Sequence, residues 1–76
     1  MRGYFLKNNK GEYLKELDTA QGKISFTNDF KEAYNYIGRP GGGAWDADNE
    51  KLFIKFHFGE EYGDRVNTLS VCSHEW

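Results

Sequence analysis

Two histidines and one cysteine are the residues in this chain best suited to metal binding or nucleophilic chemistry. Cys72 and His74 are two apart in an expected strand, so their side chains leave the same face, and His57 lies in the strand expected before it. Zinc takes nitrogen and sulfur ligands, which makes these three candidate metal ligands, and Cys72 with His74 a candidate nucleophile and base. A structural zinc normally has four protein ligands, and no third group supports catalysis. We therefore expect no cofactor and no enzymatic activity.

Acidic residues gather in two places that resemble catalytic or calcium sites only in part. Asp46, Asp48 and Glu50 have the spacing of the first oxygen ligands in a calcium-binding loop, but Lys51 stands at the sixth position, where such a loop requires glycine. Glu60 and Glu61 lie in a polar stretch, where water keeps carboxylates ionised. We interpret both groups as solvated.

Aromatic residues are abundant for so short a chain, with two Trp, five Tyr and six Phe among 76 residues. A domain of this size cannot bury all of them, so some should form an exposed binding surface. Trp45 could pack on the core or meet a partner, since tryptophan is enriched at interface hot spots. The candidate binding residues are Trp45, Tyr4, Tyr13, Phe53 and Tyr62.

The first part of the chain predicts a β-hairpin and a third strand. Two aromatic and aliphatic runs, residues 3–7 and 12–17, flank a polar stretch that ends in Gly11. A turn over 18–22 then leads to a short alternating strand over 23–26.

A helix is predicted next. Asp29 and Glu32 have the spacing of a capping box, and an apolar stripe follows at i, i+3, i+4 and i+7. The stripe runs from Phe30 to Ile37, and Gly38 and Pro40 should end the helix.

The last part of the chain predicts a loop and two more strands. Three consecutive glycines within 38–50 indicate a flexible Gly-rich loop. Residues 51–58 alternate, so Leu52, Ile54, Phe56 and Phe58 should face the helix while Lys51, Phe53, Lys55 and His57 face outward. A polar connection over 59–67 precedes a final strand over 68–74. There Leu69 and Val71 should point inward.

These elements predict one α+β domain over residues 1–76, in the order β-β-(β)-α-β-β. An antiparallel sheet of about four strands would carry one helix on one face, burying the apolar sides of both.

Charge and composition narrow the function classes. Ten basic and twelve acidic residues give a net charge of −2, which disfavours binding to nucleic-acid backbones or anionic membranes. No apolar run approaches the 20 or so residues that a membrane span needs, and no signal-peptide pattern opens the chain. The missing signal peptide leads us to expect a cytoplasmic protein, and a single cysteine, which excludes an internal disulfide, fits that compartment.

The stretch Gly3-Tyr-Phe-Leu-Lys-Asn-Asn-Lys-Gly-Glu-Tyr-Leu14, followed by Ile24-Ser-Phe-Thr-Asn-Asp-Phe-Lys-Glu-Ala33, resembles small uncharacterised proteins of phages and prophages of Gram-positive bacteria. The likeness covers about residues 3–37. It implies a phage accessory role that modulates a host protein, and it assigns no catalytic residue.

The sequence as a whole favours a non-enzymatic protein-binding module with an unidentified protein partner. Two alternatives stay open. Aromatic residues on a sheet face could stack on nucleic-acid bases, with lysines holding the phosphates. The chain could also be a small metal-binding protein built on His57, Cys72 and His74. The sequence leaves the oligomeric state open.

Overall fold

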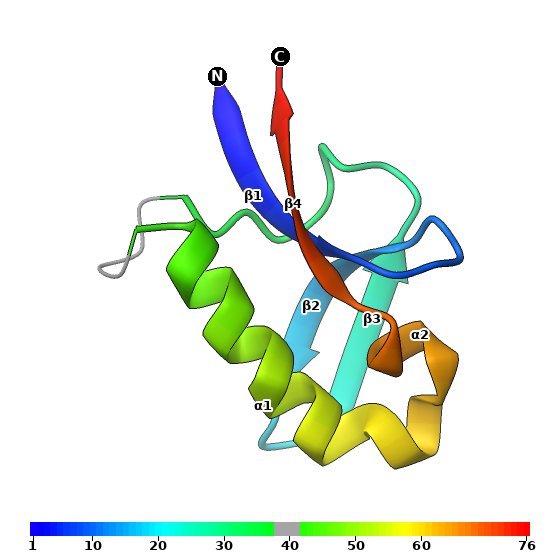
Figure 1. The fold of residues 1–76 in the computed structure, drawn as a ribbon. Helices are drawn as coiled ribbons and strands as arrows, with labels where there is room; N and C mark the ends of the chain where they lie inside the picture. Colours follow the sequence, from blue (N-terminus) through cyan, green and yellow to red (C-terminus); the bar gives the residue numbers. More distant parts are fainter. Residues whose placement is uncertain (38–41) are drawn as a thin grey trace.

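The computed structural model describes residues 1–37 and 42–76. Within them the chain forms four strands and two helices, and Figure 1 shows the longer helix lying across one face of the sheet. The elements are β1 (Arg2–Lys7), β2 (Tyr13–Asp18), β3 (Lys23–Thr27), α1 (Ala44–Tyr62), α2 (Asp64–Asn67) and β4 (Ser70–Glu75). The sheet is antiparallel, with the strand order β3-β2-β1-β4. The predicted α+β class, with about four antiparallel strands and one main helix, is confirmed.

The central pair of strands separates soon after the hairpin. β1 and β2 pair at Lys7 and Tyr13, whereas β1 pairs with β4 along its whole length. The segment 34–36 crosses the gap, because Tyr34 N–H donates to the Leu14 carbonyl and Tyr36 N–H donates to the Tyr4 carbonyl, each at 2.9 Å. This segment therefore supplies backbone partners that a paired strand would otherwise provide.

The side chain of Tyr36 anchors the segment 34–36 in the core. Its side chain is fully buried, and its hydroxyl donates a hydrogen bond of 2.9 Å to Glu50 Oε1 on α1. The surrounding core lies between the sheet and α1 and consists of Leu6, Leu14, Tyr36, Ala47, Ile54, Phe58, Val66 and Leu69. The sheet, the crossing segment and α1 thus share one core.

The predicted helix over 29–37 is wrong. Residues 28–37 form turns and extended chain. The side chain of Asp29 accepts a hydrogen bond from the Lys31 N–H, and the Asp29 carbonyl accepts one from the Glu32 N–H. Asp29 therefore caps no helix, and an isolated helix this short is marginal in water. Backbone bonds from Tyr34 and Tyr36 to the two strands replace it. The expected helix end at Gly38 and Pro40 lies outside the described residues.

The predicted strand over Lys51–Phe58 is also wrong, because these residues lie in the middle of α1. The expected Gly-rich loop over 38–50 ends earlier than predicted, since α1 begins at Ala44; residues 38–41 lie outside the described part. Residues 44–52 are rich in strong helix formers, namely Ala, Glu, Lys and Leu, and contain neither Gly nor Pro. One helix of 19 residues therefore replaces the loop end and the strand.

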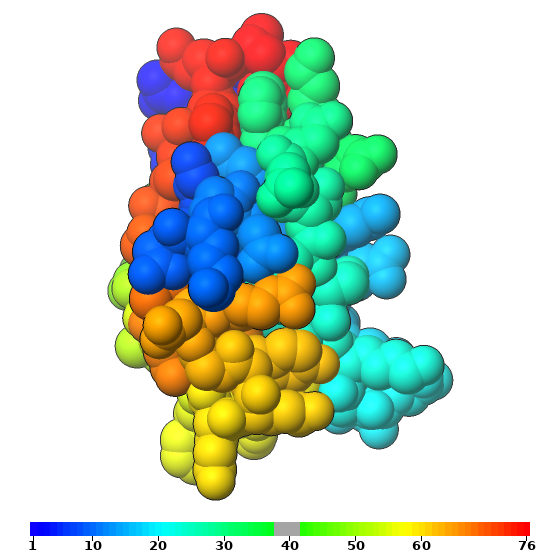
Figure 2. All heavy atoms as spheres, turned by 90° about the vertical axis from the view of Figure 1, so that its right-hand side faces the viewer, coloured from blue at the N-terminus to red at the C-terminus, as the bar shows by residue number. Residues whose placement is uncertain are grey.

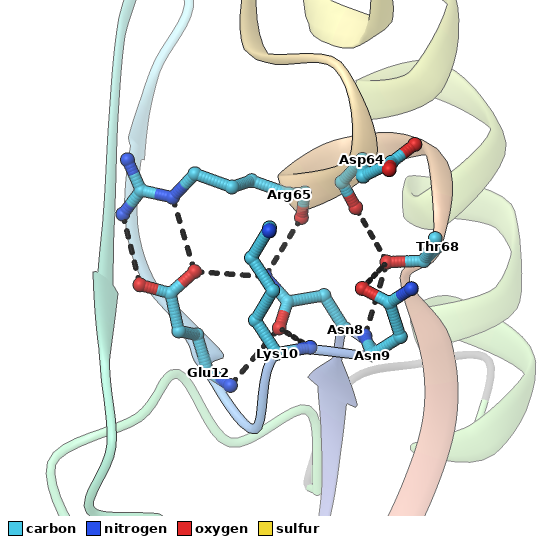
Figure 3. Close-up of polar contacts among 7 residues, drawn as sticks. All are labelled: Asn8, Asn9, Lys10, Glu12, Asp64, Arg65 and Thr68. Atoms are coloured by element: carbon cyan, nitrogen blue, oxygen red, sulfur yellow. Dashed lines mark hydrogen bonds and ion pairs between the residues drawn. The ribbon is translucent and has the colours of Figure 1, made fainter.

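A polar cluster ties the first hairpin to α2, and Figure 3 shows its contacts. Arg65 donates to both carboxylate oxygens of Glu12, at 3.0 and 3.1 Å. The buried Asn8 amide donates to Glu12 and to the Arg65 carbonyl, each at 3.0 Å, while its oxygen accepts from two backbone N–H groups of the hairpin. Figure 2 shows the hairpin tip, in blue, directly against α2 in orange.

Candidate protein-binding surface

Helix α1 has apolar side chains on two opposite faces. Ala47, Ile54 and Phe58 are buried against the sheet. Trp45, Leu52 and Phe56 follow one another by seven and four residues, which is close to two turns and one turn of a helix. Their ridge lies about 180° around the axis from Ile54, so it faces away from the core.

The outward ridge is strongly exposed. Trp45 is 63% exposed, Leu52 59% and Phe56 84%, while the neighbouring Phe53 is 42% exposed. We refer to Trp45, Leu52, Phe53 and Phe56 as the outer face of α1. Trp45 and Phe56 are eleven residues apart, so this face is about 16 Å long.

His57 extends the outer face with a fourth aromatic side chain, beside Trp45, Phe53 and Phe56. Its imidazole lies 4.2 Å from the Phe53 ring and 5.1 Å from the Phe56 ring, measured between centroids. A surface hollow of about 400 Å³ adjoins the same side of the helix, and its lining includes Phe53, Asn49 and Leu17 from β2. The outer face therefore combines projecting rings with a depression beside them.

The candidate binding residues divide into two groups. The structure brings Trp45 and Phe53 together on the outer face of α1. Tyr13 is buried, while Tyr4 and Tyr62 are half-buried and pack against the core. The expected single aromatic surface is therefore not formed by all five residues, because the three tyrosines pack within the fold.

Leu52 and Phe56 were missed as surface residues. Leu52, Ile54, Phe56 and Phe58 stand at every second position, which indicated one buried face of a strand. In a helix, however, Leu52 and Phe56 lie on the opposite side from Ile54 and Phe58. The steps of seven residues from Trp45 to Leu52 and of four from Leu52 to Phe56 were the signal that could have shown this.

A second aromatic cluster covers the sheet face opposite α1. The His74 ring stacks on Phe30 at 4.3 Å with an angle of 9° between the planes, and both rings contact Phe5. Tyr13 Oη lies 2.9 Å from His74 Nε2. Phe5 and Tyr13 are 1% and 5% exposed, so they present little ring surface on which a base could stack.

The three candidate metal ligands do not converge. His57 lies on α1, whereas Cys72 and His74 lie on β4. In the described residues, no three His, Cys, Asp or Glu side chains are grouped so that they could hold a metal ion. Burial raises the pKa of the Cys72 thiol, which keeps it protonated and weakens it as a nucleophile.

Comparisons with known proteins gave no relative: no protein-family model, no curated protein and no solved structure matches this chain. As for membranes, neither α1 nor any other helix in the described parts of the chain combines the length and apolarity that crossing a bilayer requires.

Proposed function

We propose that this chain is a non-enzymatic protein-binding module that docks onto its partner through the outer face of α1. The observation that carries the proposal is the exposure of Trp45, Leu52 and Phe56 on one ridge, directly opposite the packed face. Leaving several large apolar side chains in water is unfavourable, and contiguous exposed patches of this kind mark interaction sites.

The composition of the ridge suits a binding hot spot. Tryptophan is among the residues that contribute most to interface energies, and aromatic rings supply large contact area with few rotatable bonds. A rigid helix anchored by Ala47, Ile54 and Phe58 holds these rings in place before any partner arrives, which lowers the entropy lost on binding.

The resemblance of residues 3–37 to phage proteins suggests the partner's source. We propose a phage or prophage accessory protein that acts in the bacterial cytoplasm on a host protein. The raised pKa of the Cys72 thiol and the separation of His57 from β4 support a binding role over a catalytic one.

Comparative affinity capture tests the proposal. Tagged wild-type chain and the double variant Leu52→Gln with Phe56→Gln are incubated with a lysate of a Gram-positive bacterium, and retained proteins are quantified by mass spectrometry. Glutamine keeps helix propensity, so α1 should persist in the variant. The matched control is Lys15→Gln with Glu16→Gln, two exposed positions on β2.

We expect at least one protein that wild type and control retain equally and that the outer-face variant loses about tenfold or more. Identical retained sets for wild type and the outer-face variant would contradict docking through this face.

A further inference from the structure

Helix α1 concentrates the negative charge of the chain. It contains five acidic residues (Asp46, Asp48, Glu50, Glu60, Glu61) and two lysines, a net charge of −3, whereas the whole chain carries −2. The rest of the chain is therefore net +1. The excess of negative charge is larger on the solvent-exposed surface of α1, because Asp48, Glu60 and Glu61 are exposed while Lys51 and Lys55 are half-buried. Lys51 also pairs with Asp48 at 2.8 Å.

Two of these acids lie where helix electrostatics disfavours them. The carbonyl end of a helix carries partial negative charge, so basic side chains stabilise the last turn and acidic ones destabilise it. The last turn of α1 holds Glu60 and Glu61 and no basic residue. A position that breaks a local stability rule is a candidate for a functional role.

The acidic end adjoins the outer face. Glu60 follows Phe56 by four residues, so the two side chains are neighbours on one side of the helix. Phe56 is the most exposed member of the outer face, at 84%. The outer face is thus an apolar ridge with acid at its C-terminal end.

We propose that the outer face of α1 receives an amphipathic α-helix of the partner, whose apolar stripe is flanked by Lys and Arg. This inference rests on the proposed function. A ridge about 16 Å long matches three turns of a helix, and ridge-into-groove packing is the usual way two helices meet. Basic flanks on the partner would neutralise Glu60, which neighbours Phe56, whereas a second copy of this chain would bring two helices of −3 together.

Peptide titration tests the charge and shape of the occupant. The full chain, labelled with ¹⁵N, is titrated by NMR with an 18-residue blocked peptide that carries Leu at three- and four-residue spacing and Lys on the flanks. A second peptide has Glu in place of every Lys. We expect the Lys peptide to shift amide signals of α1, to bind at least tenfold more tightly than the Glu peptide, and to weaken with added salt.

Variants assign the effect to particular groups. Reversing charge with Glu60→Lys should weaken Lys-peptide binding about tenfold, since the variant loses an attractive charge pair and adds a repulsive one. The control Glu32→Lys makes the same change in net charge at an exposed position of the segment 28–37 and should bind like wild type.

The outcomes separate this inference from the proposed function. Equal binding of both peptides on α1 would overturn the basic-partner inference and leave docking through the outer face supported. No binding of the Lys peptide, or concentration-dependent dimerisation through α1 in sedimentation experiments, would also overturn it. Failure of the proposed function is judged separately, by the capture experiment with Leu52→Gln and Phe56→Gln.

Discussion

Glu12 joins parts of the chain that are far apart in the sequence. Its carboxylate accepts two bonds from Arg65, fifty-three residues away, and a third from Asn8 within the hairpin (Figure 3). The Arg65 guanidinium also lies over the Phe26 ring, 4.5 Å from its centroid. One arginine therefore connects the hairpin, β3 and α2, and no local pattern could have predicted this long-range contact.

Hydrogen bonds from Arg65 and then Asn8 hold the pKa of Glu12 below its ordinary value of 4.5. A folded-state pKa below the unfolded one contributes stability above pH 4.5, and this contribution is lost as the pH falls through the lowered value. We expect Glu12→Gln to lower the free energy of unfolding by about 1 kcal/mol at pH 7, because the pair is partly exposed.

Urea unfolding at pH 7 and pH 3 checks this prediction. The difference between wild type and Glu12→Gln should shrink at pH 3, because this pH lies below 4.5 and the unfolded chain then takes up a proton at Glu12. Glu16→Gln, at an exposed carboxylate of β2 four residues further along the chain, should change little at either pH. A difference for Glu12→Gln that stays constant between the two pH values would show that the ion pair contributes nothing.

Gly43 illustrates a second residue-scale constraint, at the start of α1. Its φ is +55°, and a Cβ placed there would lie 2.5 Å from the Tyr4 ring. Gly11, in the hairpin, also has a positive φ of +80° but has open space around it. A substitution at Gly11 therefore measures backbone strain alone, whereas one at Gly43 measures backbone strain together with steric overlap.

We expect Gly11→Ala to destabilise the protein by about 1 kcal/mol, from the positive φ alone. Gly43→Ala should cost about 1–3 kcal/mol more, because the Tyr4 ring must move. Thermal unfolding of the two variants measures the difference. Equal losses would mean that Tyr4 does not pack against Gly43.

At the scale of elements, the strands were more predictable than the helices. The hairpin, the short third strand and the final strand were all predicted within about two residues, and Leu69 and Val71 do face the core. The hairpin and strand patterns carry their own turn signals, such as Gly11 and the 18–22 turn, so local sequence was sufficient.

Residues 51–58 show why the main helix was misplaced. Their apolar residues alternate because α1 has apolar side chains on two faces, and alternation within eight residues is also the pattern of a strand. Only the longer window from Ala44 to Tyr62, with its helix formers, distinguishes the two. Two of the four residues of the outer face, Trp45 and Phe53, were predicted as candidate binding residues. The exposure of Leu52 and Phe56 could be recognised only once α1 was known to be a helix.

Alanine substitutions at Ile54 and Phe56 test which face of α1 packs against the sheet. Ile54→Ala should lower the free energy of unfolding by about 2–4 kcal/mol, because Ile54 is fully buried. Phe56→Ala should change it by less than about 0.5 kcal/mol, since that ring is exposed. Chemical denaturation of both variants is the measurement. Comparable losses at both positions would place the two side chains on the same face and contradict the helix.

At the scale of the whole molecule, one helix performs two tasks. Its inner face completes a core that the sheet and the crossing segment 34–36 share, and Tyr36 links that segment to α1 through Glu50. Its outer face contributes little to that core. Variants of the outer face should therefore change binding without unfolding the domain, which makes the proposed function testable.

Site-specific photo-crosslinking inside bacterial cells tests the docking surface most directly. A benzophenone side chain replaces Phe56 in one variant and the exposed Glu16 of β2 in the other. After irradiation, we predict a discrete adduct with one cellular protein from position 56 and none from position 16. An adduct from position 16 alone, or none from position 56 in a correctly folded variant, would contradict docking through the outer face of α1.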